Sequence, residues 1–215
     1  MSIATRNESG TAIAASVSVA AAPPVALIIP DGTRLRTTPA DFEILAAANR
    51  DLRLELTGSG ELIVMAPEGT ISGASNFLIA GQLSLWISKH GGVGFGSSAG
   101  FTLPNGAIRA PDAAWITSQR WQGLPANEKT GFARIVPDFV VELRSPSDRI
   151  EDCREKMLEY AAVGVRLGWL IDPSTRTVHV YRPGLEPQIL ENPERVSGED
   201  VLPGFELDTR PIFSG

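Results

Sequence analysis

The segment PDFVVELRSPSDR, residues 137–149, constrains the fold more than any other part of the chain. Its apolar run Phe139–Val141 is typical of a buried strand, yet Glu142 and Arg144 interrupt that strand just before a turn. A carboxylate in an apolar strand is costly unless it is paired, hydrogen-bonded, exposed to water or bound to a metal ion. Either the two charged residues face water or pair with each other at a strand end, or they belong to a site.

Hydrophobic periodicity and turn signals predict the elements that surround this strand. Thr38 as N-cap and Pro39 as first helical residue specify one helix start, and Asp148 with Glu151 has the spacing of a capping box at another. The expected elements are helices over 38–49, 72–90 and about 148–164, hairpins over 52–65 and 167–183, short strands between 93 and 116, and a strand or edge segment within 202–213. The sequence therefore predicts an α/β fold in which helices flank a sheet, without an internal repeat.

Length and composition indicate one soluble domain. The Ala- and Ser-rich residues 1–26 are interpreted as a flexible tail, and residues 27–215 as a single domain. No stretch is apolar enough to cross a membrane, and a single cysteine, Cys153, excludes an internal disulfide and fits a cytoplasmic location. The net charge of -6 counts against nonspecific attraction to DNA, although a bound divalent cation would offset it locally.

A second carboxylate, Asp112, also precedes an apolar strand, in the segment IRAPDAAWI. Adjacent strands lie about 5 Å apart, so Asp112 and Glu142 can share one metal ion if their strands are neighbours. Asp138 is a poorer candidate ligand, because four residues of extended strand, about 13 Å, separate it from Glu142.

The helix expected after this strand contributes a lysine. At 100° per residue, Arg149, Lys156 and Tyr160 lie along one flank of the apolar stripe formed by Ile150, Cys153, Met157 and Ala161. Lys156 therefore borders the buried face, where a lysine that merely extends from a helix flank is the common alternative.

Together these residues resemble the signature of the PD-(D/E)XK nucleases, with Pro111-Asp112 followed by Glu142-Leu143-Arg144. The chain is more closely similar to the Uma-two family within that superfamily. The segments that carry the resemblance are RLELTGSGELIVMAP, GAIRAPDAAWI, PDFVVELRSPSDR, KMLEYAAVGVRLGWLIDP and VLPGFELD, in this order along the chain.

The resemblance implies a restriction-endonuclease-like core, in which a central mixed sheet is flanked by helices, with an added N-terminal helix and hairpin. It implies an endonuclease that hydrolyses phosphodiester bonds in DNA, with Mg²⁺ or Mn²⁺ held by Asp112, Glu142 and the backbone carbonyl of Leu143. Glu55 corresponds to an early glutamate that borders the site, although exposure on the polar face of the hairpin explains it equally well.

The chain departs from the superfamily where Arg144 replaces the lysine of the signature. Arginine stays protonated, so Arg144 is expected to hold a phosphate oxygen instead of acting as a base, and Lys156 to supply the amine from the helix. A protein with this fold and a decayed site, acting only as a DNA-binding or protein-interaction module, is the main alternative. A homodimer would suit a small nuclease that cuts both strands.

Overall fold

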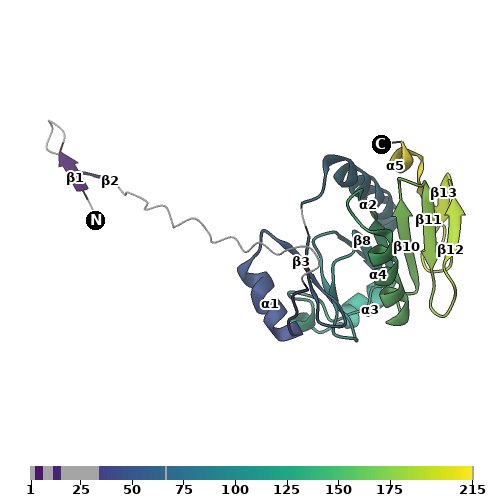
Figure 1. The fold of residues 1–215 in the computed structure, drawn as a ribbon, viewed down its shortest axis with the longest axis horizontal. Helices are drawn as coiled ribbons and strands as arrows, with labels where there is room; N and C mark the ends of the chain where they lie inside the picture. Colours follow the sequence, from purple (N-terminus) through teal and green to yellow (C-terminus); the bar gives the residue numbers. More distant parts are fainter. Residues whose placement is uncertain (1–2, 7–11, 16–33, 66, 215) are drawn as a thin grey trace. The chain divides into compact units, whose positions relative to one another are not determined.

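The computed structural model describes residues 3–6, 12–15, 34–65 and 67–214, and the chain divides into two compact units, residues 1–33 and 34–215 (Figure 1). In the first unit, β1 (Ile3–Arg6) and β2 (Ala12–Ala15) pair antiparallel. Apart from these two strands, the predicted flexible tail over residues 1–26 lies outside the described residues and stays a prediction.

A six-stranded mixed sheet forms the centre of the second unit. Its strand order is β12-β11-β10-β9-β8-β5, with β9 and β10 parallel and every other neighbouring pair antiparallel. Figure 1 shows β10, β11 and β12 side by side next to α4. The bounds are β5 Val93–Gly96, β8 Ala113–Ile116, β9 Phe139–Leu143, β10 Leu167–Asp172, β11 Thr177–Tyr181 and β12 Gln188–Glu191.

Two long helices cover the opposite faces of this sheet. Side chains alternate along β9, so Phe139 and Val141 pack with residues of α2 (Thr70–His90), while Val140 packs with residues of α4 (Ile150–Ala162). The expected mixed sheet between helices is therefore confirmed. The face that carries Val140 also carries Glu142, which places this carboxylate beside α4.

The predicted hairpin is part of a second sheet. Strands β3 and β4 pair antiparallel as expected, and two short strands extend them into a four-stranded sheet with the order β4-β3-β7-β6, whose small core includes Phe42 of the first helix. The bounds are α1 Pro39–Ala48, β3 Arg53–Leu56, β4 Leu62–Met65, β6 Phe101–Thr102 and β7 Ile108–Arg109.

Smaller elements complete the chain, and among them the expected C-terminal strand is present. They are α3 Ser118–Gly123, the 3₁₀ helix Ala126–Glu128, β13 Arg195–Ser197, β14 Glu206–Asp208 and α5 Arg210–Phe213. None of the helices in the described residues combines the length and the apolar character that a membrane crossing requires.

The N-terminal cap is as predicted in α1 but not in α4. The Thr38 hydroxyl accepts the Asp41 N–H at the start of α1, as the sequence predicts. The predicted capping box of α4 is wrong, because Arg149 is the N-cap and the Asp148 carboxylate accepts the Ser145 N–H instead.

Candidate functional site

Strand pairing brings Asp112 and Glu142 together. In the antiparallel pair β8 and β9, Ala113 is opposite Val141, and continuing that register by one residue sets Asp112 opposite Glu142. Directly opposite residues of an antiparallel pair point to the same side of the sheet, with Cα atoms about 4.5–5.5 Å apart. The two carboxylates predicted from the sequence are thus neighbours at one end of the central sheet.

Lys156 lies at the centre of the acidic group. Its Nζ atom is 2.8 Å from Glu142 Oε1 and 2.8 Å from Glu55 Oε1, so one ammonium group joins two carboxylates from different sheets. The Tyr160 hydroxyl, one helical turn further along α4, donates to the same Glu142 Oε1 at 3.0 Å. The helix flank predicted to border the buried face therefore faces the site, and the interpretation of Lys156 as a lysine merely extending from the flank is wrong.

Glu55 is an internal anchor of this group. Only 1% of the residue is exposed, so the interpretation that places it on an exposed hairpin face is wrong. Its Oε1 atom accepts the Ala110 N–H at 2.9 Å as well as Lys156, and its Oε2 atom accepts from Arg109 Nη1 at 3.1 Å. Both oxygens are occupied by donors, which suits the positioning of Lys156 better than the binding of a metal ion.

The electrostatics differ between the two glutamates that Lys156 joins. Burial raises the pKa of Glu142 to about 8, the carboxylates of Asp112 and Glu55 add repulsion, and Lys156 opposes the rise. Burial acts in the same direction on Glu55, but Lys156 and Arg109 outweigh it and lower its pKa. Burial disfavours the ammonium of Lys156, yet Glu142 and Glu55 overcome this effect and raise its pKa, so Lys156 stays protonated near neutral pH.

Asp112 is fixed by the backbone of the neighbouring strand. Its Oδ2 atom accepts the Leu143 N–H at 2.8 Å, and its Oδ1 atom is 3.6 Å from Arg53 Nη2. Burial raises the pKa of Asp112, in part against the effect of the Leu143 hydrogen bond and of Lys156.

The donor set fits a hard divalent cation. Carboxylate and carbonyl oxygens are the ligands that Mg²⁺ prefers, and among the described residues no hydrogen bond reaches Oδ1 of Asp112 or Oε2 of Glu142. Within that part of the chain, no three His, Cys, Asp or Glu side chains gather as a metal-binding group, so the candidate ligands are the two carboxylates and the Leu143 carbonyl.

Arg144 is engaged elsewhere. Its Nη1 atom is 2.8 Å from Asp172 Oδ2 and 2.9 Å from Ser174 Oγ, and its Nε atom donates to the Asp148 carbonyl at 3.2 Å. The pKa of Asp172 is lowered because donors from Ser174 and Arg144 outweigh its burial. Arg144, which stands at the position of the signature lysine, therefore connects the end of β9 to the end of β10. It forms none of the contacts that join Glu142 to Lys156.

Replacement of Arg144 by methionine is expected to lower stability and to leave the chemistry of the site largely unchanged. Asp172 would lose a charged donor while buried, which costs about 1–3 kcal/mol, and Ser174 would still donate to it. Urea unfolding measures this loss. Cleavage per folded molecule, measured in parallel, should stay close to the wild-type rate. A fall of about a hundredfold or more would instead indicate that Arg144 binds a phosphate group.

Sequence reasoning missed two side chains of the site, Arg53 and Arg109. It also missed that the hydroxyl of Tyr160, a residue already placed on the helix flank, donates to Glu142. Arg53 pairs with Glu68 as well as with Asp112, and Arg109 joins Glu55 to Glu159 through its Nη1 and Nε atoms. The period of two along β3 was a usable signal for Arg53, because it puts Arg53 on the same side as Glu55. Asp138, judged a poor ligand, is bound to Arg120 at 2.8 Å and to the Thr117 N–H.

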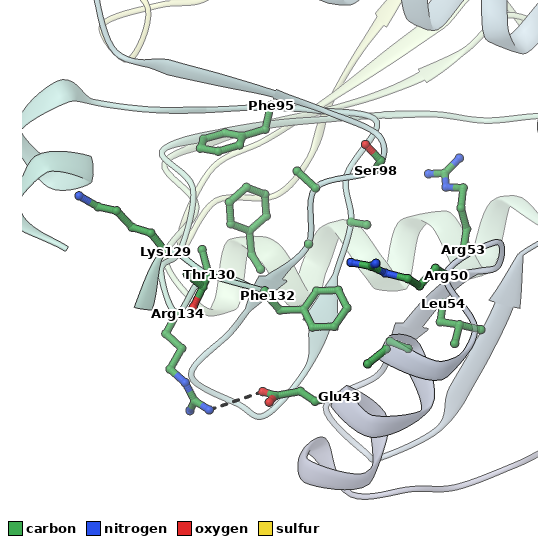
Figure 2. A pocket seen from close by; sticks show the side chains of 18 of the residues that line it. Glu43, Arg50, Arg53, Leu54, Phe95, Ser98, Lys129, Thr130, Phe132 and Arg134 are labelled. Carbon is green, nitrogen blue, oxygen red and sulfur yellow. Dashed lines mark ion pairs between the residues drawn. The ribbon is translucent and has the colours of Figure 1, made fainter. Parts of the chain in front are cut away.

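Figure 2 shows a cleft of about 1020 Å³ that is lined in part by residues in contact with the site. Two of its lining residues belong to the contacts described above, since Arg53 pairs with Asp112 and the Ala110 N–H donates to Glu55. Figure 2 shows Arg50 and Arg53 on one side of the cleft and the ion pair between Glu43 and Arg134 on another. Its charged lining residues are Arg50, Arg53, Lys129, Arg134, Glu43, Asp51 and Glu128.

Comparison with solved structures supports the fold. A crystal structure described as "a putative nuclease belonging to DUF820" from Anabaena variabilis superposes with a TM-score of 0.70 and 22% identity, covering 83% of this chain and 98% of that one. At this identity the likeness concerns the fold alone.

Curated relatives match over part of their length. Anhydro-N-acetylmuramic acid kinase of Xanthomonas oryzae pv. oryzae is 27% identical over 68% of this chain, and the C4-dicarboxylate-binding periplasmic protein DctP of Vibrio cholerae is 30% identical over 45%. The chain spans 40% of the kinase and 29% of the periplasmic protein.

A family model described as "Putative restriction endonuclease" matches residues 39–210, which include both sheets and every residue of the candidate site. The match begins at the first residue of α1 and ends at the first residue of α5. This chain therefore belongs to the Uma2 (Uma-two) family, whose nuclease fold the central mixed sheet and its flanking helices display.

Proposed function

We propose that this protein is a metal-dependent endonuclease that hydrolyses phosphodiester bonds in DNA, with Asp112, Glu142 and Lys156 at its active site. The single observation that carries the proposal is the β8–β9 register, which sets Asp112 opposite Glu142 beside a buried ammonium group. Two carboxylates and a lysine at one strand end suit phosphoryl chemistry, in which the reaction gains from a cation and from fixed positive charge.

Asp112, Glu142 and the Leu143 carbonyl would hold Mg²⁺ or Mn²⁺. Such a cation, when bound, lowers the pKa of a coordinated water and neutralises charge on the phosphate. The ionised form of Glu142 is disfavoured by burial and by neighbouring carboxylates, so a nearby positive charge would stabilise it. The hydrogen bond from the Leu143 N–H keeps Asp112 in place for this role.

Lys156 would stabilise negative charge on the phosphate. Its pKa is raised by Glu142 and Glu55, so it acts as a cation and not as the group that takes a proton from water. Glu55 would act as a positioning residue, since it holds the ammonium group from the opposite side to Glu142 and is itself held by Arg109 and Ala110.

The adjoining cleft supports a nucleic-acid substrate. Four of its lining side chains are basic and three are acidic, so the lining has a net charge of +1 in a chain whose net charge is -6. The cleft is therefore less repulsive to a phosphate backbone than the chain as a whole. Arg53 extends this charge up to Asp112.

Cleavage of supercoiled plasmid by the purified full chain tests the proposal. Nicked and linear products are expected with Mg²⁺ or Mn²⁺ and none with a chelator, and Asp112→Asn should reduce the rate at least about a hundredfold. Asp152→Asn is the matched control, because Asp152 is an exposed carboxylate on α4, and it should retain the full rate.

Calorimetric titration with Mn²⁺ gives a readout that does not depend on activity. One saturable site is expected in the wild type and in Asp152→Asn, and weaker or absent binding in Asp112→Asn. A protein that neither cleaves plasmid nor binds the ion would instead be the DNA-binding or protein-interaction module with a decayed site.

A further inference from the structure

The outer face of α2 is apolar and uncharged over five turns. From Thr70 to Ser88 the helix contains no Asp, Glu, Lys or Arg. Its large outward side chains are Ile71, Phe77, Leu78 and Leu85, which are 68%, 78%, 37% and 70% exposed. Exposed apolar surface that is continuous along one helix is unusual on a monomer and marks an interaction site.

The pattern along this face has a seven-residue repeat. Large residues recur at Ile71, Leu78 and Leu85, and small ones at Ala74, Gly81 and Ser88. All six residues are exposed, and Leu78 is the least exposed of the three large ones. In contrast, the inner face, with Ile79, Leu83 and Trp86, packs against the central sheet.

We propose that this face is a homodimer interface, in which α2 packs antiparallel against α2 of a second copy of the chain. In this arrangement Ile71 lies opposite Ser88 of the second copy, Leu78 opposite Gly81, and Leu85 opposite Ala74. One register satisfies all three pairs, because in each the residue numbers have the same sum. The face is thus complementary to itself about a two-fold axis between Leu78 and Gly81, as an isologous interface requires.

The size match selects the antiparallel pair over a parallel one. A parallel two-fold pair would stack Ile71, Leu78 and Leu85 each on its own copy and leave empty space at the small positions. The antiparallel pair instead places each of these three residues against a small one. An unrelated partner would not require the two halves of one helix face to fit each other.

Gly81→Leu is the most direct test. A Cβ atom at Gly81 meets no other atom within 4 Å, so the monomer has room for the new side chain, and leucine favours a helix more than glycine does. Sedimentation velocity of the full chain should give a dimer for the wild type and a monomer for Gly81→Leu. Thermal unfolding should show that the monomeric Gly81→Leu variant is folded, with a midpoint no lower than that of the wild type.

Gly123→Leu is the matched control. Gly123 is also an exposed helical glycine, in α3, and a Cβ atom there meets no atom within 4 Å. This variant should remain dimeric. A wild type that stays monomeric at high protein concentration, or a dimer that persists in Gly81→Leu, would overturn the proposal.

Cysteine cross-linking tests the direction of the helices, in a background where Cys153→Ser removes the native thiol. The pair Ile71→Cys with Ser88→Cys should form disulfides between subunits, which require Cα atoms about 4.4–6.8 Å apart. Ile71→Cys alone should not cross-link, because the two copies would be about 25 Å apart along the helices. Cross-linking by the single variant would indicate a parallel dimer and contradict the proposed register.

Discussion

Glu142→Gln is expected to abolish divalent-cation-dependent cleavage of plasmid DNA, with a rate at least about a hundredfold below the wild type. Glutamine keeps the shape of the side chain and can still accept from Tyr160, so the packing between β9 and α4 should survive. It cannot ionise opposite Asp112 when a cation binds, so the proposed metal site loses its second carboxylate.

The same variant is expected to be as stable as the wild type or more stable in metal-free buffer. Because the pKa of Glu142 is raised from 4.5 to about 8 in the folded protein, the wild type loses stability as pH rises through that range, and the glutamine variant lacks this loss. The difference should therefore be largest above about pH 8, and thermal unfolding at several pH values measures it.

Glu155→Gln, on the exposed side of α4, serves as the control for both measurements. It should leave cleavage and the thermal midpoint unchanged. If Glu142→Gln cleaved plasmid at the wild-type rate, Glu142 would have no part in the reaction.

Lys156→Met should destabilise the folded protein by about 3–5 kcal/mol near neutral pH, the usual effect of removing one partner of a buried charge pair. Glu55 and Glu142 would then remain buried near each other without the ammonium that joins them. Urea unfolding measures the loss, and Lys89→Met, at an exposed lysine, should lie within about 0.5 kcal/mol of the wild type.

The loss should depend on pH in a defined direction. Without Lys156 the folded-state pKa of Glu142 rises further above its unfolded value, so the variant retains more stability at about pH 5 and loses it as pH rises. Adding Glu142→Gln to Lys156→Met should recover part of the stability at about pH 8. An equal loss at both pH values would mean that packing, and not charge, explains the effect.

The fold and the main site residues followed from short-range signals. The alternation in β9 put Val140 and Glu142 on one side, and helical spacing put Lys156 and Tyr160 on the flank that faces the site. Asp112 was identified because it directly precedes one apolar strand, and Glu142 because it lies near the end of another. The resemblance to the family added the early glutamate, Glu55.

What could not be predicted depended on pairing between distant segments. The burial of Glu55 follows from contacts with Arg109 and Lys156, which lie 54 and 101 residues away in the sequence. Arg144 reads as a site residue from its place after Glu142, and only the parallel pairing of β9 with β10 places Asp172 within its reach.

The dependence of the Asp112–Glu142 pair on strand register also determines which insertions and deletions the chain can tolerate. Residues 117–138 connect β8 to β9, and the Thr117 N–H donates to Asp138 where the connection begins and ends. A change of length between these two residues is expected to leave the strand register unchanged. One residue gained or lost inside either strand would turn its carboxylate toward the opposite side of the sheet, since side chains alternate at every step. Related chains should therefore vary in length in that connection and keep the short spacing from each carboxylate to its strand.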